Sequence, residues 1–219
     1  MTGDVVIQRV ALPSRTASAR LIVVVRAPDA AAYAPVLDVL VDAGIQSLEL
    51  TLSTPGTLEA LPQLRERYDG VADVGVGTVT DADQLTAAID SGARYIVTPI
   101  TSAELVTQST GAGVPIVPGG FTPTELFTSW AAGASAVKVF PAGRLGPGYA
   151  ADLRGPFPDL EFVPSGGVDL ESADAWLRAG AVAVSVGGPL LGDAFAGGDA
   201  QALRRRAEAF VALCRREPA

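Results

Sequence analysis

The strongest constraint on the fold is a repeated alternation of short β-rich runs with longer amphipathic stretches. Eight such runs occur in the 219 residues, at 21–26, 47–52, 73–77, 94–98, 114–118, 135–140, 160–164 and 182–187. Segments with apolar residues at helical spacing follow them, at 32–43, 57–68, 81–91, 101–112, 122–132, 147–154, 170–179 and 200–216. The pattern predicts parallel βα units of an α/β fold, and eight such units close into one (β/α)8 TIM barrel.

Residues at the helix ends support the same interpretation. Four predicted helices run into a glycine before the next strand, at Gly44, Gly92, Gly133 and Gly180. A glycine at this point permits the left-handed backbone that ends many helices. Four predicted helices also begin at a residue suited to capping: Thr57, Asp81, Thr122 and Asp169.

An open, doubly wound sheet of the flavodoxin type is the alternative architecture. The eight units, and the lack of a Gly-x-Gly-x-x-Gly motif after the first run, favour the barrel. No Ser/Gly-rich linker divides the chain, so we expect one domain over residues 1–219. Within it, residues 1–19 are expected to form an N-terminal extension or a helix.

The composition excludes several classes of protein. No apolar stretch reaches the roughly 18 residues that span a bilayer, and the N-terminal residues lack the long apolar segment of a secretory signal. A net charge of −8 opposes broad binding to nucleic acid or to anionic membranes. We therefore expect a cytoplasmic protein that acts on a small molecule and binds neither nucleic acid nor membrane.

The reactive side chains narrow the chemistry further. The chain has no histidine and a single cysteine, Cys214, which excludes histidine-based catalysis and an intrachain disulfide. Its sequence offers no plausible metal-binding set, so we expect neither a metal nor another cofactor. Catalysis must then depend on lysine, arginine, carboxylates, hydroxyls and backbone dipoles.

Lys138 is the strongest catalytic candidate. It is the only lysine among 16 basic residues, and it lies in the apolar run SAVKVF near the end of a predicted strand. A lysine amine can lose its proton and attack a carbonyl, whereas a guanidinium group stays charged. Desolvation in such a strand favours the neutral amine that condenses with a ketone. The alternative is an ordinary ion-paired or solvent-facing lysine.

Glu49 is the best candidate for the accompanying acid and base. Alternation along its strand places leucines on one face, toward the helices, and Glu49, Thr51 and Ser53 on the other, toward the barrel mouth. A carboxylate beside an imine can move the protons that imine formation and bond cleavage require. A purely structural ion pair with Arg26 or Lys138 is the alternative role.

Other candidates follow other strands, where (β/α)8 barrels gather their sites. Arg26 ends the first strand, where a guanidinium could hold a substrate carboxylate. Glycine-rich turns at 165–168 and 186–192 suit phosphate binding through backbone N–H groups. Two hydroxyls could hold a water or a substrate oxygen, and two apolar residues could exclude water: Thr78, Thr98, Phe140 and Pro141.

These residues lie in an ordered set of segments that resembles the class I 2-keto-3-deoxy-6-phosphogluconate (KDPG) aldolase family, also called 4-hydroxy-2-oxoglutarate aldolase. The resemblance runs from about residue 20 to about residue 214. Its pieces are VVVRA (23–27), AGIQSLELTLSTP (43–55), GVGTVT (75–80), YIVTP (95–99), VPGGFTPTE (117–125), VKVFPA (137–142), LGPGYAADLRGPFP (145–158), FVPSGGV (162–168) and VSVGGPLLG (184–192).

The resemblance implies roles for particular residues. It assigns the Schiff-base lysine to Lys138 and the acid/base glutamate to Glu49. It implies that Thr78 and Pro99 line the site and that phosphate binds at Ser165, Gly166, Gly167, Gly187 and Gly188. Two departures bear on the substrate. Some members have arginine where Ser53 stands, which shifts carboxylate recognition to Arg26, and members commonly carry serine where this chain has Gly188 and Pro189.

The resemblance also implies a homotrimer and a metal-independent lyase. Such an enzyme cleaves a KDPG-like 2-keto-3-deoxy-6-phospho sugar acid to pyruvate and glyceraldehyde 3-phosphate, or 4-hydroxy-2-oxoglutarate to pyruvate and glyoxylate. Three alternatives stay open from the residues alone. They are a phosphate-binding barrel epimerase or synthase, a decarboxylase that uses the same imine, and a non-catalytic protein that binds a sugar phosphate or a 2-oxo acid.

Overall fold

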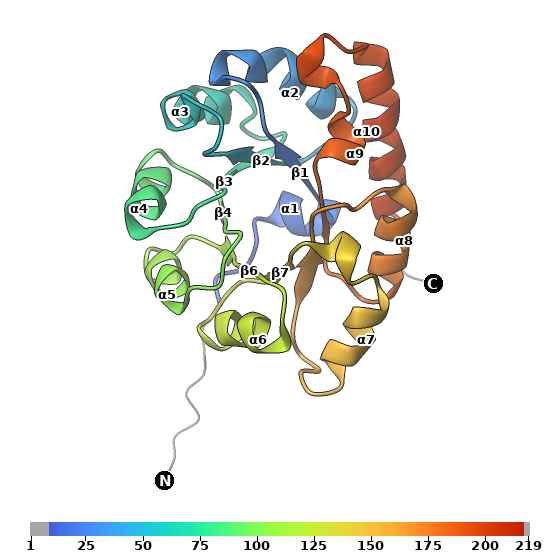
Figure 1. The fold of residues 1–219 in the computed structure, drawn as a ribbon. Helices are drawn as coiled ribbons and strands as arrows, with labels where there is room; N and C mark the ends of the chain where they lie inside the picture. The colour runs from blue at the N-terminus through green and yellow to red at the C-terminus, as the bar shows by residue number, and fades with distance from the viewer. Residues whose placement is uncertain (1–8, 217–219) are drawn as a thin grey trace.

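The computed structural model describes residues 9–216, whose strands form a ring surrounded by helices (Figure 1). Six strands pair in the order β5-β4-β3-β2-β1-β9 and three in the order β6-β7-β8, and every pairing is parallel. Their bounds are β1 (Leu21–Val25), β2 (Ser47–Thr51), β3 (Asp73–Gly77), β4 (Ile96–Val97), β5 (Ile116–Val117), β6 (Gly119–Gly120), β7 (Val137–Val139), β8 (Phe162–Pro164) and β9 (Val184–Val186).

Two connections join these sheets into one barrel. β5 and β6 occupy a single strand position that is interrupted at Pro118, whose carbonyl accepts the Lys138 N–H at 2.7 Å. On the opposite side, Ser165 after β8 forms a parallel bridge with Ser185 in β9. Eight strand positions therefore close the ring, which confirms the predicted (β/α)8 barrel and excludes the open sheet.

Several strands are shorter than the sequence predicts. β4 and β5 each span two residues where five were expected, and prolines lie beside both, at Pro99, Pro115 and Pro118. A proline has no N–H to donate to a strand ladder, so the regular pairing stops although the chain continues in the same direction.

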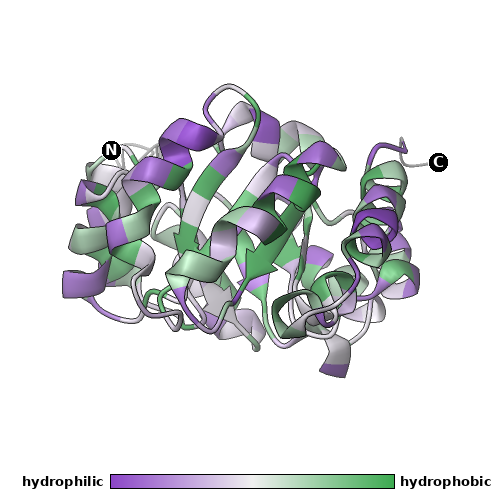
Figure 2. Cartoon of the chain, turned by 90° about the horizontal axis from the view of Figure 1, so that it is seen from above, coloured by the Kyte–Doolittle hydropathy of each residue, from purple (hydrophilic) through white to green (hydrophobic). Residues whose placement is uncertain are grey.

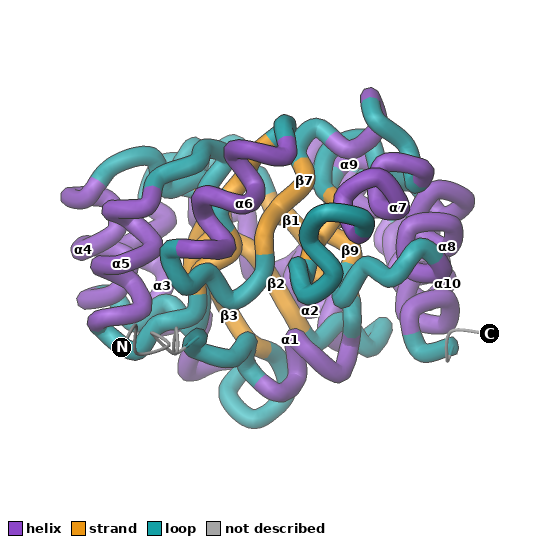
Figure 3. The backbone as a smooth tube through the Cα atoms, turned by 90° about the horizontal axis from the view of Figure 1, so that it is seen from below, coloured by secondary structure: helices purple, strands orange, loops and turns teal. Residues whose placement is uncertain are grey.

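Helices form the outer layer around the strands (Figure 3). The strands are mainly hydrophobic, whereas the helices also carry hydrophilic residues (Figure 2), most of whose charged members are exposed. The principal helices are α2 (Tyr33–Asp42), α3 (Thr57–Arg67), α4 (Ala82–Asp90), α5 (Ala103–Gly111), α6 (Pro123–Ala131), α7 (Gly148–Arg154), α8 (Leu170–Arg178) and α10 (Ala200–Cys214). Shorter turns are α9 (Gly188–Leu191), η1 (Ala30–Ala32), η2 (Ala142–Arg144) and η3 (Ala194–Ala196). None of the described helices combines the length and apolar character that a membrane crossing requires.

One predicted helix cap is wrong. Thr57 is the first residue of α3, and the cap is Gly56, whose φ of 77° starts the helix from a left-handed conformation. The Thr57 hydroxyl is buried against the preceding loop, where it lies 2.8 Å from the carbonyl of Thr54. The other three predicted caps are confirmed, at Asp81, Thr122 and Asp169. The four glycines at helix ends have φ between 89° and 103°, as predicted.

A short helix, α1 (Ser14–Ala19), lies across the end of the barrel where the strands begin (Figures 1 and 3). The buried Thr16 hydroxyl donates to Asp73 Oδ2 at 2.9 Å and lies 2.9 Å from Ser47 Oγ. Asp73 and Ser47 are the first residues of β3 and β2, so α1 is tied to the strand starts. Of the expected extension over 1–19, residues 1–8 lie outside the described part, and the single-domain division of the whole chain stays a prediction.

The barrel interior is packed with side chains and is not a pore. Seven buried residues in or next to β1, β4, β5, β7, β8 and β9 fill it: Ile22, Tyr95, Val97, Val117, Ala136, Val163 and Ala183. The alternate residues of the strands point outward and form the main core against the helices. A ligand can therefore enter only above this packed layer, at an end of the barrel.

Candidate active site

A cavity of about 160 Å³ opens at the carboxyl ends of the strands. Eleven of the residues that the sequence suggested for catalysis or substrate binding line it, in chain order Arg26, Glu49, Thr78, Pro99, Lys138, Phe140, Ser165, Gly166, Gly167, Gly187 and Gly188. Segments more than 150 residues apart in the sequence thus meet at one end of the barrel. The strand-end rule for (β/α)8 barrels located all of them.

Two suggested residues lie elsewhere, and one residue was missed. Thr98 and Pro141 do not line the cavity, and the Thr98 hydroxyl donates to the carbonyl of Ile100 instead. Val24 does line it, as does Pro189 of the predicted turn at 186–192. Strand alternation could have indicated Val24, because it lies two residues before Arg26 and shares its face.

Lys138 projects from the middle of β7 into the barrel. Its neighbours Val137 and Val139 are fully buried in the outer core, which turns the intervening side chain inward. Lys138 itself is only 7% exposed. The strand therefore holds the amine at the base of the cavity, shielded from bulk water.

Glu49 faces Lys138 across the cavity. The distance from Lys138 Nζ to Glu49 Oε1 is 3.9 Å, which is too long for a hydrogen bond. Glu49 is 1% exposed, and its Oε2 is buried without a hydrogen-bond partner among the described residues. A buried carboxylate oxygen left unpaired is costly, and such costs are typical of functional sites.

The surroundings of Glu49 shift its protonation. Burial raises the pKa of the Glu49 carboxyl above its ordinary value, and the nearby charges of Lys138 and Arg26 partly oppose that rise. A carboxyl with a raised pKa can both hold and release a proton closer to neutral pH. Glu49 therefore has the properties required of a general acid and base.

Arg26 lies at the rim of the cavity, just beyond the end of β1. It is exposed and forms no ion pair with the carboxylates in the described part of the chain, so Glu49 and Arg26 do not make the structural pair considered above. Its guanidinium is therefore available to an anionic group of a ligand.

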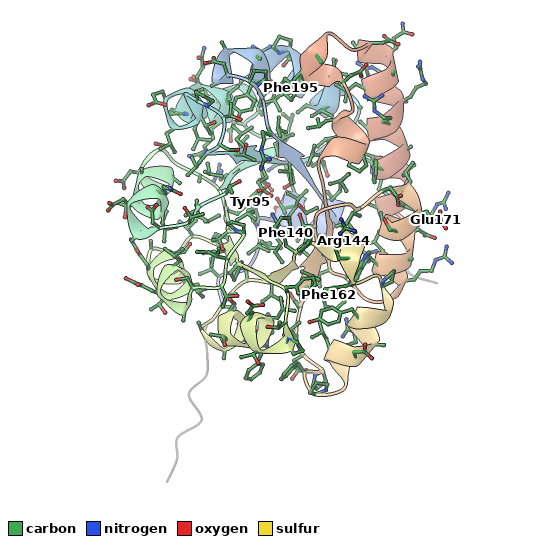
Figure 4. All side chains as sticks on the ribbon, in the orientation of Figure 1. Tyr95, Phe140, Arg144, Phe162, Glu171 and Phe195 are labelled. Carbon is green, nitrogen blue, oxygen red and sulfur yellow. The ribbon has the colours of Figure 1, made fainter. Side chains whose placement is uncertain are left out.

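Glycine-rich turns after β8 and β9 form another part of the cavity wall. Gly166 and Gly167 both have left-handed backbone, with φ of 83° and 76°. A Cβ on Gly166 would lie 2.9 Å from the ring of Phe140, so the glycine lets that ring pack against the turn. The Phe140 ring in turn has its centre 5.3 Å from Lys138 Nζ. Figure 4 shows Phe140 at the mouth of the barrel.

A second cavity, of about 540 Å³, adjoins the first. The two share Val24, Arg26, Gly187 and Gly188. The remainder of its lining is uncharged: Ala27, Pro28, Leu191, Gly192, Phe195 and Ala196. Figure 4 shows Phe195 in the segment between α9 and α10. The two cavities therefore adjoin each other at Arg26 and the Gly187–Gly188 turn.

Comparison with known proteins identifies the family of the chain. Residues 12–205 match the aldolase family described as KDPG and KHG aldolase. The 2-dehydro-3-deoxy-6-phosphogalactonate aldolase of Escherichia coli K12 is 33% identical over 173 residues, which cover 78% of this chain and 83% of that protein.

Solved structures of the family share the fold. A KDPG aldolase from Zymomonas mobilis superposes with a TM-score of 0.80 at 26% identity, over 92% of this chain and 98% of that one. A KDPG aldolase from Legionella pneumophila, with pyruvate captured at low pH as a covalent carbinolamine intermediate, gives a TM-score of 0.74 at 25% identity. That match covers 91% of this chain and 95% of the Legionella chain.

The raised pKa of Glu49 leads to a prediction about stability. A carboxyl whose pKa is higher in the folded chain binds more protons when folded, so stability falls as pH rises from the ordinary value of 4.5 through the folded pKa. Glu49→Gln keeps the size of the side chain and removes the charge. Urea unfolding at neutral pH should therefore show a more stable variant, with a difference that shrinks as pH falls toward 4.5. A variant less stable than wild type at neutral pH would contradict this prediction.

Proposed function

Because the chain belongs to the KDPG and KHG aldolase family, we propose that it is a class I aldolase of 2-keto-3-deoxy-6-phospho sugar acids. The products are pyruvate and glyceraldehyde 3-phosphate. We propose 4-hydroxy-2-oxoglutarate, which yields pyruvate and glyoxylate, as a second substrate. The observation that carries the proposal is the buried pair of Lys138 and Glu49, 3.9 Å apart in a cavity at the carboxyl ends of the strands.

The reaction begins with imine formation at Lys138. Its neutral amine adds to the C2 carbonyl of the substrate to form a carbinolamine. Loss of water, assisted by proton transfer from Glu49, converts the carbinolamine to a protonated imine. The carbinolamine of pyruvate in the Legionella pneumophila relative supports this route, because the relative is related to this chain over most of its length.

Bond cleavage uses the imine as an electron sink. Glu49, directly or through a water, takes the proton of the C4 hydroxyl while the C3–C4 bond breaks. The electron pair of that bond moves to C3 and the imine nitrogen, which gives an enamine and frees the aldehyde. Protonation of the enamine at C3 and hydrolysis of the resulting imine release pyruvate and regenerate Lys138.

Substrate binding follows the shape and charge of the two cavities. The first cavity accommodates the 2-oxo acid end, with Arg26 holding the carboxylate and Thr78, Pro99 and Phe140 enclosing the reacting carbons. The glycine turns at 165–167 and 187–188 offer backbone N–H groups to the phosphate. The adjoining cavity supplies room for the distal carbons, since the first is small for a six-carbon phosphorylated substrate.

The proposal also includes the cellular location and the oligomeric state of the protein. We propose a cytoplasmic homotrimer, in line with the expectation from the family resemblance. Large apolar side chains on the surface support an assembly, because Phe121 and Phe127 are 41% and 43% exposed. Phe127 also stacks on Phe157, with ring centres 4.6 Å apart, which extends the apolar surface from α6 toward the segment after α7.

Light scattering tests the assembly directly. A homotrimer has three times the 22.3 kDa mass of one chain. Phe127→Glu, which places a charge on the apolar surface, should lower the mass toward that of one chain if the trimer buries it. A wild-type mass of one chain at micromolar concentration would contradict the trimer.

Lys138→Arg tests the nucleophile. Arginine keeps the positive charge but cannot form the imine, so we expect aldol cleavage to fall on the order of 10³-fold or more. Production of pyruvate from KDPG can be followed in a coupled assay, and circular dichroism checks that the variant is folded. Cleavage at even a tenth of the wild-type rate by a folded variant would refute the role of Lys138.

Phe195→Trp tests the second cavity. A larger ring there should narrow the space for the distal carbons and lower kcat/KM for KDPG about 10-fold. The shorter 4-hydroxy-2-oxoglutarate should be cleaved at close to the wild-type rate. Leu170→Trp, at an exposed position outside both cavities, is the control and should leave the cleavage of both substrates unaffected. Equal losses for the two substrates in Phe195→Trp would oppose the assignment.

A further inference from the structure

The inner face of β3 carries no side chain at the two positions beside Glu49. Val74 and Val76 belong to the outer core, so alternation turns Gly75 and Gly77 toward the barrel interior. β3 pairs with β2 in a register that places Gly75 opposite Glu49. Two consecutive inward positions next to the buried carboxylate therefore carry no side chain.

The backbone does not require glycine at either position. Both residues lie in a regular parallel strand, and neither has the positive φ that favours glycine. Glycine in a strand interior weakens the strand and often marks close approach by another group. The reason for these two glycines must then be the space that they leave.

Neighbouring side chains fill that space. A Cβ on Gly75 would overlap the ring of Tyr95, which is fully buried in the barrel interior (Figure 4). A Cβ on Gly77 would overlap Glu49 Oε1 and would lie 2.7 Å from its Cδ and 2.9 Å from its Cγ. Gly75 therefore accommodates a packed ring, whereas Gly77 accommodates the carboxylate that faces Lys138.

The two contacts would respond differently to an added methyl group. The Tyr95 ring is enclosed by core residues and cannot move without disturbing the barrel. The Glu49 carboxylate is the end of a flexible side chain, so it can rotate away at a smaller cost in stability. Its displacement would change the separation from Lys138 Nζ, which is 3.9 Å in the present arrangement.

We propose that Gly77 is a positioning residue, whose lack of a side chain sets the Glu49 carboxylate where it can transfer protons at the Lys138 imine. This inference rests on the proposed function, in which Glu49 is the acid and base. In this role Gly77 does not contact the substrate and acts only through Glu49.

Gly77→Ala should therefore reduce turnover more than stability. General acid–base catalysis contributes typically 10²- to 10⁴-fold, so we expect kcat for KDPG cleavage to fall about 10²-fold with KM changed less than about 3-fold. Exchange of the pyruvate methyl protons with solvent deuterium, followed by NMR, should slow to a similar extent. That exchange needs the imine and the base but no aldehyde.

A double-mutant cycle separates this role from a general structural one. In the Glu49→Gln background, where the base is already absent, Gly77→Ala should slow the exchange no more than about 2-fold further. Gly75→Ala is the matched control in the same strand. Gly75→Ala should lower the stability toward urea, because its added methyl group overlaps the Tyr95 ring. The folded fraction of this variant should nevertheless keep at least about half of the wild-type exchange rate per molecule.

The outcomes distinguish this inference from the proposed function. Wild-type exchange in Glu49→Gln overturns both. If Glu49→Gln loses exchange, two results overturn the role of Gly77 alone. One is a wild-type rate of exchange in Gly77→Ala. The other is an equal fold-loss from Gly77→Ala in the wild-type and in the Glu49→Gln backgrounds.

If Gly77→Ala does not fold, Gly77→Ala/Glu49→Asp is used, because the shorter carboxylate leaves room for the methyl group. It should fold and match Glu49→Asp, and an unfolded double variant contradicts the proposal.

Discussion

The site depends on two ionisable groups held close together in a place where water is largely excluded. Lys138 and Glu49 lie on strands from opposite parts of the ring, and both are buried. Each would be costly to bury alone, because burial disfavours a charged group. The separation of 3.9 Å and the unpartnered Glu49 oxygen leave the pair incompletely satisfied. That incomplete pairing is what makes the groups available for chemistry.

The fold maintains this arrangement through packing. Below the pair, Tyr95 and aliphatic residues fill the barrel, so neither side chain can retreat into the interior. Above it, the turns around Gly166 and Gly187 leave the cavity open to a ligand. The chain as a whole is strongly acidic, yet Lys138 and Arg26 are the cationic side chains that line this cavity. Attraction of an anionic substrate is therefore local to the site.

Much of this arrangement could be predicted because two of its features can be recognised in short stretches of sequence. They are the alternation of side chains along a strand and the gathering of site residues at the carboxyl ends of barrel strands. The leucines on either side of Glu49 indicated the face on which the carboxylate lies, and the glycines at four helix ends indicated where those helices stop. Alternation also indicates that Gly75 and Gly77 point inward, but it does not show which neighbour fills their space. That depends on how the Tyr95 ring and the Glu49 side chain pack in three dimensions. The cavity beside Phe195 and the buried hydroxyl of Thr57 likewise depend on contacts between segments that no local pattern contains.

If Lys138 forms an imine with a 2-oxo acid, chemical reduction can trap that imine and locate it in the chain. Incubation of the folded protein with pyruvate and borohydride reduces the imine to a stable secondary amine, which peptide mass spectrometry can locate. One pyruvate-derived adduct per chain is expected, on the peptide that contains Lys138. Failure of a folded, cleavage-competent enzyme to acquire this adduct, or an adduct confined to another residue, would show that Lys138 is not the imine-forming residue.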